Sequence, residues 1–183
     1  GGLSKDQKVS IESTINELKH LEQSVSSILE FQNFEKFKGE QSQKVDVKNL
    51  VLEQAQKFAC QVGISPDSHS DSDAHGELIR ICLGHIFKFL ATKGLGADIT
   101  VHCQNKGSHL HVVIQRKSKG FSEEQLKGLF DVSEGKKQEH RLGIEGTLVK
   151  SILRAHSGQV TLRHSHHSGG LEILLEIPIH QSR

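Results

Sequence analysis

The sequence predicts an α+β fold, a two-layer sandwich in which helices cover one face of a mostly antiparallel sheet, preceded by one long helix. Three patterns predict this fold. An apolar repeat spaced by threes and fours runs unbroken through the N-terminal segment. Two amphipathic helical segments follow it, and two pairs of alternating strands then enclose a further helix. We therefore expect a coiled-coil or dimerisation helix over residues 1–38 and a sandwich domain over 39–183.

The bulk composition argues against several classes of protein. The chain has 23 basic and 22 acidic residues, so no net field favours nucleic acid. It has no Tyr or Trp on which bases could stack. Its three cysteines are widely spaced, which predicts buried reduced thiols in a cytosolic setting. No apolar run reaches the roughly 20 residues of a membrane span, so we expect no membrane contact from this chain, although a membrane segment could precede it.

The first long segment, residues 4–37, predicts a single helix. Ser4 is suited to cap it together with Gln7, three residues later. One stripe carries the apolar residues Ile11, Ile15, Leu18, Leu21, Val25, Ile28, Leu29 and Phe31. Because the compact remainder of the chain cannot cover so long a stripe, we expect a partner helix from an upstream segment or a second subunit, which would make a dimer through residues 4–37.

The next elements follow from periodicity and from glycines. Residues 47–62 predict an amphipathic helix that ends at Gly63. The Ser/Asp-rich stretch 65–76 predicts a loop, since it has too few apolar residues to pack. Residues 77–94 are strongly apolar with helical spacing, which predicts a core helix closed by Gly94.

The C-terminal half alternates between strand and helix patterns. Residues 98–104 and 109–115 alternate at period two around the turn "NKGS", which predicts a hairpin. Residues 122–130 predict a short helix and are followed by a charged loop. Residues 143–158 predict a helix that ends at Gly158, and a closing pair of strands completes the sheet.

This order of elements, with these strings, resembles the ATP-binding catalytic domain of sensor histidine kinases, the Bergerat-type fold. "LVKSILRAHSGQVTLRHSHHSGGLEILLEIPI" is similar to the last helix and closing hairpin of that family. "ELIRICLGHIFKFL" resembles its N box, and "GFSEEQLKGLFD" resembles the end of its G1 segment with the F box. "INELKHLEQSVSSILEFQNFEKF" resembles the second helix of the dimerisation hairpin.

The resemblance implies an ATP site, and this chain departs from its pattern. In the N box, two asparagines four residues apart and a following basic residue hold magnesium and phosphates. Those places fall here on His85, Phe89 and Thr92. A phenyl ring can neither ligate magnesium, which prefers oxygen ligands, nor bond phosphate.

The two glycine-rich segments also depart from the family pattern. The G1 aspartate that accepts the adenine amine is replaced by Arg116, which has only donors. Ser118 stands at the first glycine place of G1, and Gly120 keeps the second. In G2, Gly143 is kept, but Glu145 stands at the next glycine place, where its carboxylate would repel a triphosphate.

We interpret the chain as a histidine-kinase-like signalling module, a pseudokinase that needs no cofactor, pairs with a second copy, and docks a receiver or histidine phosphotransfer domain. The alternative is an active protein-histidine kinase with an unorthodox site for ATP and Mg²⁺. A shift of the motif alignment by a few residues would favour that alternative.

The histidines suggest two further hypotheses. His20 lies on the long helix, where an imidazole could accept a phosphoryl group, but we interpret it as a solvated position. His164, His166 and His167 form a histidine-rich hairpin tip that could hold a metal. We interpret that tip as a polar turn, because no cysteine or carboxylate pair is adjacent, and we expect no metal site.

Overall fold

The computed structural model describes residues 4–37, 43–64, 70–91, 99–117, 143–165 and 170–179. Its elements, in chain order, are α1 (Lys5–Phe37), β1 (Gln43–Asp46), α2 (Val47–Lys57), β2 (Gln61–Ile64), β3 (Asp71–Ala74), α3 (Gly76–Ala91), β4 (Ile99–Lys106), β5 (His109–Arg116), α5 (Gly143–Ala155), β6 (Gln159–His164) and β7 (Leu171–Pro178). The short helix predicted over residues 122–130 and the charged loop after it lie outside these residues.

The main sheet has five strands in the order β2-β4-β5-β7-β6. The pairs β4–β5, β5–β7 and β7–β6 are antiparallel, and β2 joins the edge parallel to β4. The turn of the β4–β5 hairpin contains Gly107 with φ of 62°, a conformation that favours glycine. The predicted α+β sandwich with a mostly antiparallel sheet is therefore confirmed.

Alternation along the strands divides the sheet into a core face and an outer face. On β5, Leu110, Val112 and Ile114 are fully buried and share a face with Arg116. The residues between them lie on the outer face. The core face meets a layer of helices, which explains why the central strands are so rich in apolar residues.

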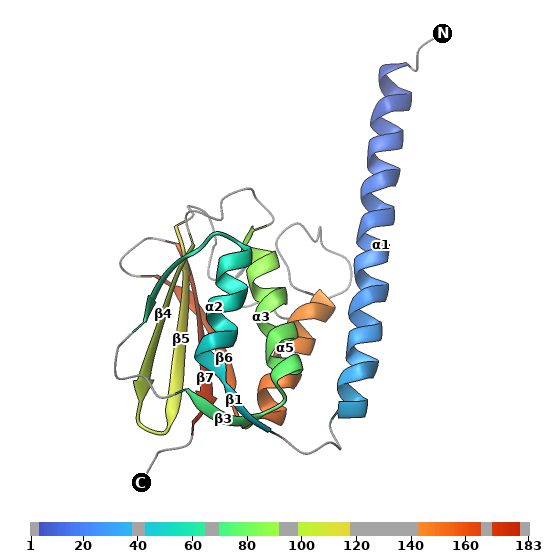
Figure 1. Ribbon diagram of the computed structural model, residues 1–183. Helices are drawn as coiled ribbons and strands as arrows, with labels where there is room; N and C mark the ends of the chain where they lie inside the picture. The colour runs from blue at the N-terminus through green and yellow to red at the C-terminus, as the bar shows by residue number, and fades with distance from the viewer. Residues whose placement is uncertain are drawn as a thin grey trace.

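The helices form one layer on this face, with α2 beside α3 and α3 beside α5 (Figure 1). Helix α1 stands outside that layer and contacts α5. Phe34, near the C-terminal end of α1, is 3% exposed and belongs to the hydrophobic core. Figure 1 shows that the N-terminal part of α1 extends beyond the sandwich.

The long helix and its cap are confirmed. The Ser4 N–H donates to Gln7 Oε1 at 2.9 Å, and the Gln7 N–H donates to Ser4 Oγ at 3.2 Å. Eight of the described apolar side chains on α1 remain 44–63% exposed: Val9, Ile11, Ile15, Leu18, Leu21, Val25, Ile28 and Leu29. None of the helices within the described ranges is both long enough and apolar enough to cross a membrane.

The prediction that one helix covers residues 47–62 is wrong over residues 58–62. Helix α2 ends at Lys57, and residues 61–64 form strand β2. Ala59 takes a positive φ of 52°, and the N–H of Cys60 donates back to the Ala55 carbonyl, which closes the helix. Glycine usually occupies this left-handed position at the end of a helix. Because alanine does so here, the sequence does not mark where α2 ends, and the amphipathic pattern continues past it.

The loop predicted over residues 65–76 is also partly wrong, because Asp71–Ala74 is strand β3, paired antiparallel with β1. Ser72 and Ala74 are buried while the two aspartates are exposed, so the strand alternates with small residues in place of large apolar ones. Asp46 caps α2 and also accepts from the Ser70 hydroxyl, which ties this small sheet to the helix layer.

Candidate functional site

The predicted site residues that the structure describes lie at one end of the sandwich: His85, Phe89, Arg116, Gly143 and Glu145. The backbone N–H of His75, just before α3, donates to His156 at the C-terminal end of α5, so α3 and α5 run antiparallel. Helix α5 then turns directly into β6, whose last residue, His164, pairs with Leu171 of β7. Leu171 in turn pairs with Arg116. The end of α3, the start of α5 and the end of β5 therefore lie together.

Arg116 ends β5 on the core face. Its neighbours across the strands are Ile99 and Leu171, both fully buried, and Arg116 itself is 4% exposed. Its Nε atom is buried and has no hydrogen-bond partner among the described residues. A guanidinium in such surroundings costs free energy unless an acceptor satisfies it. Among the described residues, this end of the sheet thus presents an unsatisfied donor, the Arg116 Nε–H, on its core face.

His85 and Phe89 lie one turn apart on the second half of α3. Both are half-buried, and Phe89 packs against the hydrophobic core. Gly143 is the first residue of α5, and Glu145 follows in its first turn, half-buried. A carboxylate at this position is favourable for the helix, because the first turn carries the positive end of the helix dipole.

The other residues singled out above cannot be placed in this site. Thr92, Ser118 and Gly120 lie outside the described residues. His20 is on α1, outside the sandwich, and its side chain is not among those described. Phe31, the last residue of the predicted stripe, is likewise on α1 with an undescribed side chain.

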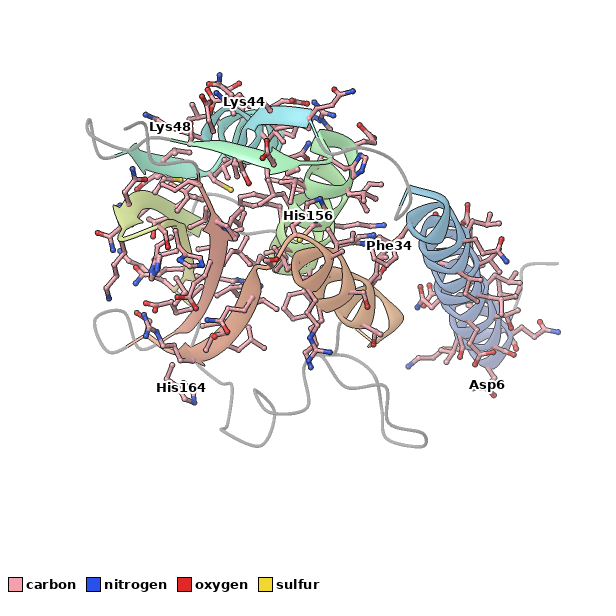
Figure 2. All side chains as sticks on the ribbon, turned by 90° about the horizontal axis from the view of Figure 1, so that it is seen from below. Asp6, Phe34, Lys44, Lys48, His156 and His164 are labelled. Carbon is pink, nitrogen blue, oxygen red and sulfur yellow. The ribbon has the colours of Figure 1, made fainter. Side chains whose placement is uncertain are left out.

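The histidine-rich hairpin tip is only partly described. His164 ends β6 and is half-buried, while His166 and His167 fall outside the described residues. Within the described ranges, no group of three or more His, Cys, Asp or Glu residues is placed to hold a metal ion. Figure 2 shows His164 at the edge of the sheet, away from His156.

The cysteine thiols are shielded. Burial raises the pKa of Cys82 to about 12 and that of Cys103 to about 11, and it also raises the pKa of the half-buried Cys60. The prediction of buried thiols is confirmed for Cys82 and Cys103. Such thiols are poor nucleophiles and poor metal ligands at neutral pH, because both roles need the thiolate.

The outer face of the sheet carries two satisfied carboxylates on β7. Glu172 accepts from Gln115 Nε2 at 2.7 Å and from Arg163 Nε. Glu176 lies 3.2 Å from His111 Nε2 and accepts from Gln159 Nε2. Burial lowers the pKa of His111 by more than nearby Glu176 raises it. These contacts join β6 and β5 to β7.

Sequence reasoning did not single out His156, whose ring makes a polar contact between the end of α5 and the start of α3. The signal was present, because His156 follows α5 directly and lies four residues after Ile152, whose carbonyl it can reach. Its second partner, the His75 backbone, is 81 residues away in sequence. Only the fold brings the two together.

Comparison with known proteins agrees with this architecture. Among solved structures, the chain is similar to the mycobacterial sensor histidine kinase MprB, with a TM-score of 0.60 at 15% identity, covering 75% of this chain and 97% of that one. It is similar to the histidine kinase domain of the E. coli osmosensor EnvZ, with a TM-score of 0.60 at 20% identity, covering 79% and 92%.

A third similar structure is full-length ShkA in complex with AMPPNP, with a TM-score of 0.66 at 16% identity, covering 100% of this chain and 41% of that one. No protein with a curated description matches the sequence. Residues 70–181 match the family described as histidine kinase-, DNA gyrase B- and HSP90-like ATPase, and this match spans more than half of the chain. The chain therefore belongs to the histidine kinase-, DNA gyrase B- and HSP90-like ATPase family.

Proposed function

We propose that this ATPase-family domain serves two-component signalling as a pseudokinase, which does not bind ATP in the usual way and acts through dimerisation and partner docking. The observation that carries the proposal is a buried arginine, Arg116, at the end of β5. The family resemblance puts an adenine-accepting aspartate at this place, and a guanidinium can only donate. Arg116 is also 4% exposed between Ile99 and Leu171, so it has little room to turn away.

Phe89 supports the same proposal from the opposite layer. The resemblance puts a magnesium-binding asparagine there, but the phenyl ring packs against the core and has no oxygen to offer. The residues present therefore do not fit ATP with Mg²⁺. The charge of Glu145, near the start of α5, adds repulsion toward a polyphosphate.

A nucleotide titration tests the proposal. The probe is AMPPNP, the analogue in the similar ShkA structure, and it is added together with Mg²⁺. Isothermal titration calorimetry with the full chain measures the binding. We expect no saturable binding up to about 1 mM, which corresponds to less than about 4 kcal/mol of binding free energy. A magnesium-dependent Kd in the micromolar range would refute the pseudokinase proposal and favour an active kinase with an unorthodox site.

A matched pair of variants controls this titration. Arg116→Asp together with Phe89→Asn restores an acceptor and a carboxamide, so measurable AMPPNP binding is expected if these two places alone exclude the nucleotide. The control, Arg154→Asp, makes the same charge change at an exposed position on α5 and should bind no better than the original chain. Circular dichroism confirms that each variant is folded before it is titrated.

Dimerisation is proposed through α1. Eight apolar side chains on this helix are 44–63% exposed, and a stripe of that size is stabilised by a second helix. Because Phe34, near the C-terminal end of α1, is buried in the core and α1 contacts α5, a second copy would pair along the part of α1 that extends beyond the sandwich.

The oligomeric state tests this contact. Analytical ultracentrifugation of the original chain should show a concentration-dependent dimer. Leu18→Asn, in the centre of the exposed stripe, should shift the chain to monomer, whereas Ser13→Asn, an exposed polar position, should leave the dimer unchanged. A chain that stays monomeric at about 100 μM, a concentration at which contacts of even modest affinity persist, would contradict the proposal.

The partner class and the cell compartment belong to the same proposal. A module of this family that no longer transfers phosphate would act by docking a receiver or histidine phosphotransfer domain in the cytoplasm. Crosslinking with a panel of such domains from the same organism, with the Leu18→Asn variant alongside, tests whether docking occurs and whether it needs the dimer.

A further inference from the structure

The imidazole of His156 joins two helices that are far apart in sequence. Its Nδ1 atom lies 2.7 Å from the Ile152 carbonyl, within α5. Its Nε2 atom lies 3.0 Å from the backbone N of His75, just before α3. Figure 2 shows His156 where the C-terminal end of α5 faces α3. The ring is half-buried, and the His75 ring stands edge-on to it at 6.2 Å between centroids.

These two partners settle the protonation state of the ring. A carbonyl can only accept, so Nδ1 carries a hydrogen and donates to Ile152. A backbone N–H can only donate, so Nε2 must be without a hydrogen and accept from His75. Both contacts exist together only in the neutral imidazole with its hydrogen on Nδ1.

A second proton would remove the link to α3. It would occupy Nε2, against the His75 N–H, and so replace an attractive contact with a repulsive one. The His75 carbonyl accepts the first hydrogen bond of α3, from Ile79, so the new charge would also sit at the positive end of that helix dipole. The turn that follows α5 is closed by a backbone hydrogen bond, in which the Gly158 N–H donates to the Leu153 carbonyl at 2.8 Å.

The neighbouring charges reinforce this effect. Burial lowers the pKa of His156, the Ile152 carbonyl partly opposes that, and the charge of His75 lowers it further. The other charged groups of the surrounding elements are Asp71 and Asp73 on β3, Glu77 and Arg80 on α3, and Lys150 and Arg154 on α5. Glu77 and Arg80 pair with each other at 2.7 Å, and of all these groups only His75 contributes to the shift.

We infer that His156 is a proton-sensitive latch between α5 and α3, closed when its ring is neutral and open when the ring is protonated. The latch fixes the relative position of the helix that carries His85 and Phe89 and the helix that begins at Gly143. Acidification would therefore weaken the connection between these two helices at the end of the sandwich opposite the candidate site. This inference does not depend on whether the domain binds a nucleotide.

The direction of the pH effect follows from linkage. In the unfolded chain the imidazole titrates near its ordinary pKa of about 6.5, and in the folded chain it titrates lower. The latch is therefore fully effective above about pH 6.5, and its contribution is lost as the pH falls from there through the folded pKa. At most one proton is involved, so the opening equilibrium changes by up to about tenfold per pH unit in that window.

Two measurements on the full chain test the latch. Imidazole ¹⁵N–¹H spectra at pH 7.5 should show the hydrogen of His156 on Nδ1. Amide hydrogen exchange between pH 7.5 and 5.5 should show the protection factors of the His75 and Ile79 amides falling by up to about tenfold per pH unit, before those of the central strands fall. A His156 ring with its hydrogen on Nε2 would overturn the inference.

A matched substitution separates the latch from a general acid effect. In His156→Asn the amides at the start of α3 should be weakly protected at both pH values, and their dependence on pH should disappear. His164→Asn, a histidine on the edge strand, should behave like the original chain. Equal pH dependence at His75 in the original chain and in His156→Asn would refute the latch. If His156→Asn does not fold, the ring spectrum and the exchange of the original chain decide alone.

Discussion

Gly158 occupies a place where even one methyl group cannot fit. A Cβ built on it would lie 2.6 Å from the Glu176 carbonyl oxygen and 3.4 Å from the Leu153 carbonyl oxygen. Both obstacles are backbone atoms, held by the β6–β7 ladder and by the helix. The Gly158 N–H also donates to the Leu153 carbonyl, which pins it from the other side. We expect Gly158→Ala to destabilise the fold by about 1–3 kcal/mol, the usual cost of overpacking.

Gly84→Ala is the matched control. It makes the same chemical change inside α3, where the nearest atom to the new Cβ is Gln54 Oε1 at 3.8 Å, an ordinary contact. Because alanine favours the helix by roughly 0.8–1 kcal/mol over glycine, this variant should be more stable than the original chain. Urea unfolding measures both, with the midpoints moving in opposite directions at unchanged m-value.

The expected difference between the two variants is about 2–4 kcal/mol, or on the order of 4–16 °C in Tm for a chain of this size. If Gly158→Ala matched or exceeded the stability of the original chain, the close approach of Gly158 to the Glu176 carbonyl of β7 would be wrong. If Gly84→Ala were instead strongly destabilising, the space beside the Gln54 side chain would be too small for a methyl group, and the reasoning would be refuted.

Three further outcomes can be checked on the same chain. Asp46→Ala should cost about 1–2 kcal/mol in urea unfolding, because it removes the cap of α2 and the acceptor for the Ser70 hydroxyl; an unchanged midpoint would contradict that role. Cys82 and Cys103, with pKa values of about 12 and 11, should resist a thiol reagent at pH 8 until the chain unfolds, as read by mass spectrometry, and rapid labelling of either would show that the core opens. Burial lowers the pKa of His111 in the fold, so its contribution to the free energy of unfolding is intact above about pH 6.5 and is lost as the pH falls from there. His111→Gln should therefore reduce the dependence of Tm on pH in the acid range. An identical dependence in the variant and the original chain would show that His111 does not cause it.

The sequence was sufficient to predict elements whose pattern is long and strongly apolar. The spacing of α3 and α5 and the alternation of β4, β5 and β7 each point to one structure, because the same residues that define the pattern form the core. The strands β2 and β3 were missed for the opposite reason. Each has four residues, and β3 buries only Ser72 and Ala74 on one face, so backbone pairing with a distant strand decides its structure.

The residues of the candidate site come from the resemblance, and their place in the fold comes from the structure. The resemblance located Arg116, Phe89 and Glu145, and the topology brings their elements to one end of the sandwich. The burial of Arg116 could not be foreseen, because an arginine at the end of a strand is usually exposed. The contact between His156 and His75 could not be foreseen either, since it depends on the antiparallel arrangement of two helices separated by the central hairpin.

The way α1 is attached has a mechanical consequence. Its 33 residues form a rod about 50 Å long, and the rod is held to the sandwich at the Phe34 end. If the angle of α1 at the Phe34 end changes by about 5°, its N-terminal tip moves by about 4 Å, given the length that the helical rise per residue implies. A small rearrangement of the packing around Phe34 would thus move the N-terminal tip of α1 by about the width of a side chain. In the same way, a force that moves the tip would act on the packing around Phe34.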